Sequence, residues 1–164
     1  MENLDEMILH FMQDIYYAER QIMKALPKMA KAAQSLDLKA AFTQHREETQ
    51  GQIERLQKAF EALGKRAKGV TCEAINGLIE ECEELLEEAK EPGPVRDAGL
   101  AACAQAVEHY EIARYGTLVA WTKAKGLTEV AALLQETLDE EKKTDLLLSK
   151  LGNSNLNKQA AKAA

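Results

Sequence analysis

The sequence predicts an all-α fold: an antiparallel four-helix bundle with a short extra helix in the crossover between its two helical hairpins. Alanine and leucine occupy 47 of the 164 positions, whereas the β-branched residues valine and isoleucine occupy only 12, which favours helix over sheet. Four of the expected helices have about 24–32 residues each, a length typical of bundle helices. A chain of this length can form one domain with its own core.

The first half of the chain contains two long expected helices. The first begins at Asn3, a good N-cap with an acid three residues later, and runs to about residue 34. Pro27 should bend or interrupt it, because proline lacks the amide hydrogen that the helix requires. The second helix runs from about residue 38 to 63 and ends at Gly64.

The second half contains a short helix and then two long ones. The short helix spans about residues 71–90, and Pro92 and Gly93 separate it from a helix that runs from Pro94 to about residue 125. The last helix covers about residues 128–151. We therefore expect a helical bundle over residues 1–152 and a polar, flexible C-terminal tail over residues 153–164.

Charge and cysteine content exclude several classes of partner. The net charge of −6 and the pI near 5.2 argue against sequence-independent nucleic-acid binding and against docking on an anionic membrane. The longest uncharged stretch has ten residues, 98–107, against the ~20 of a transmembrane helix. Cys72, Cys82 and Cys103 form no C-x-x-C motif, which favours free thiols in a reducing compartment. We expect a cytoplasmic protein with neither nucleic acid nor a membrane as its partner.

Acidic side chains stand in the apolar stripe near the middle of every long helix. They are Glu19 on the first helix, Glu48 on the second, Glu108 and Glu111 on the fourth, and Glu141 and Asp145 on the fifth. Mid-helix positions of an antiparallel bundle lie at similar heights, so these six acids should converge. Buried carboxylates without partners are strongly disfavoured, and basic residues on the same faces are too few to neutralise them. Two divalent or trivalent cations would do so, and hard oxygen ligands suit Fe, Mn or Mg.

The arrangement of these acids resembles that of a known group of proteins. A glutamate on each of the first two helices, Glu108-His109-Tyr110-Glu111 on the fourth and a paired site on the fifth resemble the ferritin-like di-iron carboxylate superfamily, with the rubrerythrin-type arrangement closest. Three segments also resemble a particular family, the YciF-like bacterial stress proteins: residues 17–21, 41–49 and 107–116. The resemblance covers about residues 3–151 and implies a ferritin-like bundle.

The resemblance also implies a set of metal ligands. Carried over residue by residue, it makes Glu19 a terminal ligand and Glu48 and Glu141 bridging carboxylates, with Glu108 and Glu111 as the two ligands of the fourth helix. Asp145 stands where the superfamily often has a histidine. On the second helix the equivalent histidine falls on Gly51, which cannot ligate, and the neighbouring Gln52 could offer its carbonyl oxygen. His45 is either a ligand or a hydrogen-bonding partner of one.

The functional hypothesis combines this ligand set with the resemblance. We expect a carboxylate-bridged dinuclear centre that contains two Fe ions, or Mn, per chain. The resemblance implies a role in the stress response, in which the metals react with dioxygen or hydrogen peroxide as in a peroxidase, catalase or ferroxidase. We also expect a homodimer, since such bundles commonly self-associate. Two alternatives stay open: a non-catalytic structural or interaction bundle, and an iron-storage module.

Overall fold

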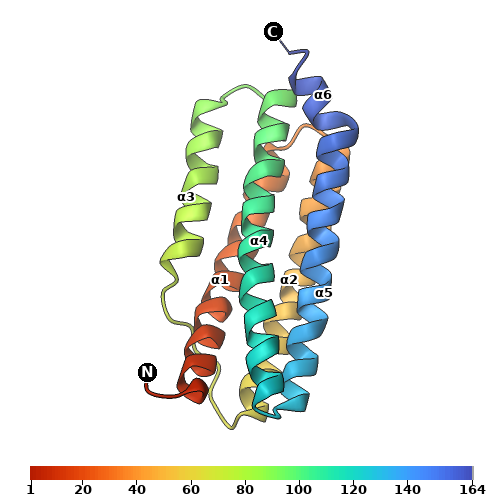
Figure 1. The fold of residues 1–164 in the computed structure, drawn as a ribbon. Helices are drawn as coiled ribbons and strands as arrows, with labels where there is room; N and C mark the ends of the chain where they lie inside the picture. The colour runs from red at the N-terminus through yellow and green to blue at the C-terminus, as the bar shows by residue number, and fades with distance from the viewer. Residues whose placement is uncertain (164) are drawn as a thin grey trace.

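The computed structural model describes residues 1–163, and the regular secondary structure of these residues is entirely helical, with no β-strand (Figure 1). The predicted all-α class is confirmed. The helices are α1 (Leu4–Ala32), α2 (Leu36–Ala62), α3 (Glu73–Glu88), α4 (Pro94–Ala124), α5 (Thr128–Leu151), a π-helical turn η1 (Gly152–Leu156) and α6 (Asn157–Ala160). Among these residues, no helix combines the length and the apolar character that a bilayer crossing requires.

The four long helices pack side by side in a closed ring. Helix α1 packs against α2 and α4, and α5 packs against the same two helices, with neighbours running in opposite directions (Figure 1). The shorter α3 lies outside this ring, against α1 and α4, and connects the end of α2 to the start of α4 at the opposite end of the molecule. This arrangement is consistent with the predicted four-helix bundle and its crossover helix.

Helix α1 illustrates how the sequence pattern becomes the core. Its buried residues recur every three or four positions, so they form one face that is directed at the other helices. Ile8, Met12, Ile15 and Ile22 on this face are at most 3% exposed. Pro27 lies in the last part of α1 on an exposed position, and the helix continues through it without interruption.

Side-chain caps hold the turn between α1 and α2. Ser35 Oγ accepts a hydrogen bond of 3.3 Å from the Leu38 amide, so α2 begins two residues earlier than expected. Asp97, at the start of α4, is only 3% exposed and accepts hydrogen bonds from the backbone amides of Gln34 (2.8 Å) and Ser35 (2.7 Å). The carboxylate therefore ties the α1–α2 turn to α4.

The segment after α5 is helical in the structure as far as Ala160. Leu156 in η1 is only 2% exposed, and η1 and α6 both contact α4. The expected flexible tail of residues 153–164 thus begins with a segment that packs on the bundle, and its last residue, 164, lies outside the described part of the chain.

Candidate metal centre

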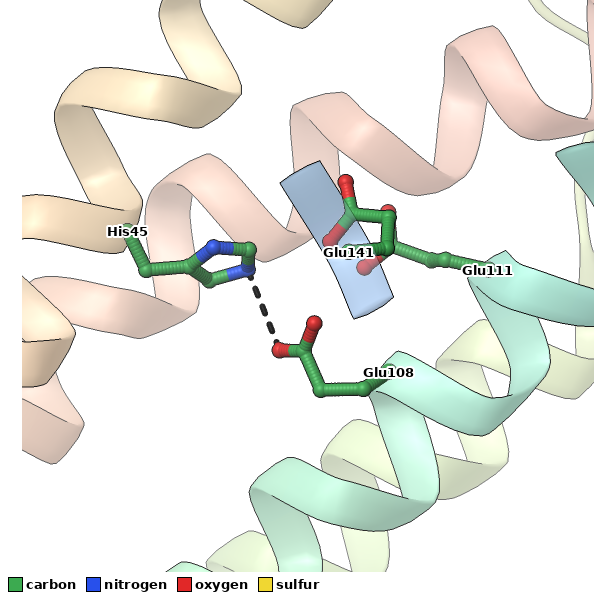
Figure 2. A group of neighbouring side chains, drawn as sticks. All are labelled: His45, Glu108, Glu111 and Glu141. Carbon is green, nitrogen blue, oxygen red and sulfur yellow. Dashed lines mark ion pairs between the residues drawn. The ribbon is translucent and has the colours of Figure 1, made fainter. Parts of the chain in front are cut away.

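Four side chains from three helices meet in the middle of the ring (Figure 2). His45 of α2, Glu108 and Glu111 of α4, and Glu141 of α5 each offer a ligand atom, and these atoms lie within 4.8 Å of one another. We call these four residues the inner cluster. Glu108 and Glu111 are three residues apart and therefore share one face of α4. His45 is 4% exposed and the three glutamates are at most 1% exposed, so the inner cluster is buried.

The polar atoms of the inner cluster lack partners. Both carboxylate oxygens of Glu111 and of Glu141, and one oxygen of Glu108, are buried without a hydrogen bond. Neither ring nitrogen of His45 makes a hydrogen bond, although its Nε2 lies 3.2 Å from Glu108 Oε1. Buried polar atoms are nearly always paired in proteins, and buried carboxylates are paired with cations or coordinate metals. This donor set of carboxylate oxygens and one imidazole fits a metal ion.

Glu19 of α1 lies beside the inner cluster. Its side chain is fully buried, and Oε1 accepts a hydrogen bond from the Tyr115 hydroxyl of α4. Its other oxygen, Oε2, has no partner. All four helices of the ring thus direct a buried side chain with an unpartnered polar atom toward this part of the core.

Burial raises the pKa of all four buried glutamates, Glu19, Glu108, Glu111 and Glu141, because the core disfavours their ionised form. For Glu19, Glu108 and Glu111, repulsion from Glu141 is the next largest cause. The pKa of Glu141 is raised by burial against the opposing effects of His45 and Glu108. Protons and metal cations can both neutralise such groups, so the two would compete for them.

Glu48 and Asp145 lie at the edge of this region, outside the group of four. The Glu48 side chain is 30% exposed, accepts a hydrogen bond from Gln44 Nε2 (2.9 Å) and lies 3.8 Å from His45 Nδ1. The neighbouring His45 lowers the pKa of Glu48. The Asp145 side chain is 19% exposed and accepts a hydrogen bond from Gln105 Nε2 (3.1 Å). Both carboxylates are therefore partly solvated.

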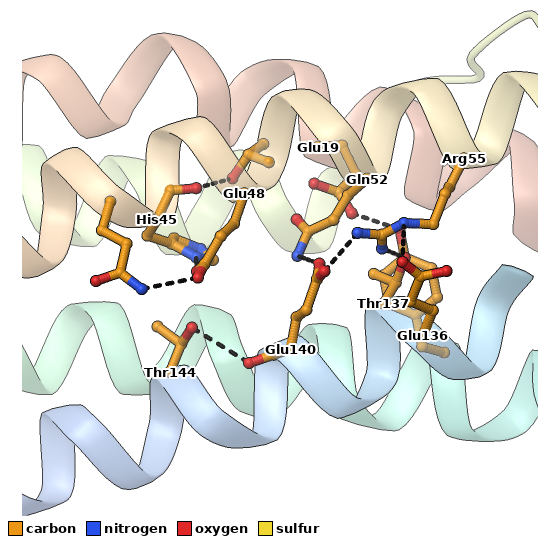
Figure 3. Close-up of polar contacts among 12 residues, drawn as sticks. Glu19, His45, Glu48, Gln52, Arg55, Glu136, Thr137, Glu140 and Thr144 are labelled. Carbon is orange, nitrogen blue, oxygen red and sulfur yellow. Dashed lines mark hydrogen bonds and ion pairs between the residues drawn. The ribbon is translucent and has the colours of Figure 1, made fainter.

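Arg55 on α2 is placed near the buried glutamates but is engaged elsewhere (Figure 3). Its guanidinium donates to Glu140 Oε1 (2.5 Å) and to Thr137 Oγ1 (2.6 Å), both on α5. Gln52 is fully buried and donates to the same Glu140 carboxylate (3.1 Å), while its own carbonyl oxygen has no partner. In the described part of the chain, no lysine or arginine forms an ion pair with Glu19 or with a glutamate of the inner cluster.

Sequence reasoning found most of the residues in this region and missed some of their partners. It placed Glu19, Glu108, Glu111 and Glu141 on inward faces, and the structure buries all four. It did not single out Tyr115 as a partner of these acids. Tyr115 lies four residues after Glu111, on the same face of α4, and that spacing was the available signal for a phenol beside the acids. Nothing in the periodicity marked the contact of Arg55 with Glu140.

Comparison with known proteins relates this geometry to a family. The family described as "Domain of unknown function (DUF892)" matches residues 3–161. Protein YciF of Escherichia coli (strain K12) is 45% identical over 165 residues, covering 100% of this chain and 99% of YciF. The crystal structure of that E. coli stress protein covers 96% of this chain and 99% of its own, with a TM-score of 0.91. YcfI of Rhodopseudomonas palustris, for which a structural role has been suggested, is 49% identical, with coverages of 90% and 94% and a TM-score of 0.88.

Proposed function

The chain belongs to the DUF892 family and is a homologue of the stress protein YciF, and on that premise we propose that it is a ferritin-like metalloprotein. In this proposal the inner cluster and Glu19 hold two Fe ions, or Mn, in a carboxylate-bridged centre. The observation that supports it is the set of six buried carboxylate oxygens without partners on Glu19, Glu108, Glu111 and Glu141.

The charge of these glutamates favours two ions over one. When ionised, the four side chains carry a charge of about −4 in a part of the core where no lysine or arginine pairs with them, a state that low-dielectric surroundings strongly disfavour. Two divalent cations would balance that charge. A single divalent ion would leave two ionised carboxylates uncompensated.

The chemistry of the donors favours iron or manganese. Carboxylate oxygens are hard ligands, and an imidazole is well suited to Fe, so one His with several Glu fits Fe or Mn better than an ion that prefers thiolates. Glu48, Asp145 and Gln52 are further ligands in this proposal. Glu48 and Asp145 are partly exposed at the edge of the centre, whereas Gln52 is buried and its carbonyl oxygen has no partner.

An apolar pocket supports reaction of the centre with a small oxidant. Side chains of the four long helices and of α3 line it, including Ile22, Phe42 and Leu78, and it extends to His45 and Glu108. We propose that dioxygen or hydrogen peroxide reaches the metals by this route during stress. Bound iron or manganese would supply the redox chemistry, and the apolar lining would limit the access of water.

Metal analysis tests the proposal directly. Protein reconstituted with Fe(II) or Mn(II) and then desalted should contain about two metals per chain by elemental analysis. Glu111→Gln should lose most of this metal, whereas Glu47→Gln, which changes an exposed acid of α2, should retain it. Near-zero metal in folded wild-type protein would refute the proposal and favour the structural role suggested for YcfI.

Two further measurements separate the catalytic hypothesis from a purely structural role and from iron storage. Consumption of peroxide by metal-loaded protein, and not by the metal-free form, would support catalysis over a purely structural function. Size-exclusion chromatography addresses assembly: we propose a homodimer, whereas a shell of many subunits would favour iron storage.

A further inference from the structure

Two of the three cysteines lie on α3 and α4, helices that pack against each other. Cys82 on α3 and Cys103 on α4 both line the apolar pocket that extends to His45 and Glu108. Both are free thiols. The third cysteine, Cys72, lies elsewhere: its sulfur is 2.9 Å from the Tyr110 hydroxyl, and it does not line the pocket.

A glycine allows the two helices to approach closely beside this pair. Gly99 lies one turn before Cys103 on α4, and a Cβ atom added there would be 2.6 Å from Leu85 Cδ1, which lies one turn after Cys82 on α3. Any larger residue at this position would push the helices apart or displace Leu85. The close contact keeps the α3 and α4 backbones near each other, which a disulfide between them requires because its two Cα atoms must lie within about 7 Å.

The surroundings give the two thiols different properties. Interaction with Cys82 lowers the pKa of Cys103 to about 7, whereas interaction with Cys103 and burial raise the pKa of Cys82. Cys103 is also partly exposed, while Cys82 is only 7% exposed. The thiolate is the nucleophilic form of cysteine, so Cys103 is the sulfur that would react first and Cys82 the one that would resolve the product.

We propose that Cys82 and Cys103 are a redox pair that hydrogen peroxide converts into a disulfide joining α3 to α4. The Cys103 thiolate attacks one peroxide oxygen, the O–O bond breaks, and Cys103 becomes a sulfenic acid while the other oxygen leaves as hydroxide and takes up the proton that Cys103 had lost. The Cys82 thiol then attacks the sulfenic sulfur, forming the S–S bond and releasing a second water. The two sulfurs lose two electrons, and the peroxide gains them.

The reaction uses no metal, so it can be tested apart from the proposed metal centre. Metal-free, reduced full-length protein is treated with hydrogen peroxide, alkylated and digested without reduction. Neither lysine nor arginine separates Cys72 from Cys82, so the tryptic map is made on Cys72→Ser, in which the two remaining cysteines fall on different peptides. The expected product is an intramolecular link between the Cys82 and Cys103 peptides, with loss of two hydrogen atoms from the chain and reversal by dithiothreitol.

Single variants distinguish the two roles. Cys82→Ser should stop at the sulfenic acid, and dimedone should label Cys103 in it. Cys103→Ser should form no disulfide and should react with peroxide at least tenfold more slowly than wild type. The proposal is overturned if Cys72→Ser gives no Cys82–Cys103 link, if the link forms only between two chains, or if Cys103→Ser reacts as fast as wild type.

Discussion

Replacing Glu111 with glutamine should stabilise the metal-free protein and destroy its response to metal. Glu111 is fully buried and neither of its oxygens has a partner. Glutamine has nearly the same shape but cannot ionise, so the substitution removes the cost of burying a carboxylate there. Such opposite effects are expected of a residue retained to bind a ligand at the expense of stability.

The magnitude follows from the titration of Glu111. Burial and the neighbouring Glu141 raise its pKa above the ordinary value of 4.5. Between 4.5 and the raised pKa, the native state holds a proton that the unfolded chain has lost, so the free energy of unfolding falls as pH rises, by up to about 1.4 kcal/mol per pH unit. Below pH 4.5 both states are protonated and this contribution vanishes. As pH rises above 4.5, the free energy of unfolding of metal-free Glu111→Gln should therefore exceed that of wild type by a further amount of up to about 1.4 kcal/mol per pH unit. This corresponds to about 3–6 °C in Tm per pH unit.

Urea and thermal unfolding in the presence of a chelator, at several pH values from 5 to 8, measure this difference. Glu47→Gln serves as the control, since Glu47 is an exposed acid on α2 and its substitution should show no such pH dependence. With Fe(II) or Mn(II) at about 100 times its Kd, wild type should gain about 2.7 kcal/mol for each ion bound and Glu111→Gln much less. A Glu111→Gln protein whose stability relative to wild type does not change with pH would refute the reasoning.

Three other substitutions test contacts outside the inner cluster, each by urea denaturation against wild type. Tyr115→Phe should cost about 1–3 kcal/mol, because Glu19 loses its only hydrogen bond while it stays buried; an unchanged midpoint would contradict this. Asp97→Ala should cost about 2–4 kcal/mol, because two backbone amides lose a charged, buried acceptor, and Asp97→Asn should recover part of the loss. Gly69→Ala should cost about 1–3 kcal/mol, because its Cβ would lie 3.0 Å from Tyr17 Cβ and 3.3 Å from Tyr17 Cα; a neutral effect would show that the loop can move away.

The helices and their inward faces could be predicted from sequence because both depend on local periodicity. Asn3 caps α1 as expected, and its side chain accepts a hydrogen bond from the Glu6 amide. The apolar stripes placed Glu19, Glu108, Glu111 and Glu141 on inward faces, and all four are buried. An apolar stripe shows which face of a helix is buried. The similar heights of the four acids follow because helices of similar length pack antiparallel in the bundle.

The position of α2 relative to its neighbours could not be predicted in the same way. Its buried face is polar for three turns, and the sequence prediction made Glu48 a bridging ligand, Gln52 a possible ligand, and His45 either a ligand or a hydrogen-bonding partner of one. The structure places His45 within the inner cluster and leaves the Glu48 side chain 30% exposed. That outcome depends on how far α2 is rotated and shifted against α1 and α5, which is determined by the packing of the whole ring.

The carboxylate of Asp97 links the two halves of the chain in a way that bears on how they fold. The amides of Gln34 and Ser35 receive their acceptor from a residue about 60 positions further along the chain. The N-terminal hairpin therefore lacks this protein acceptor for the two amides at its tip until α4 has docked, and it buries one face of each of its helices only when the C-terminal hairpin is in place. A chain divided between α3 and α4 should give two fragments that are unfolded separately and become helical only when mixed.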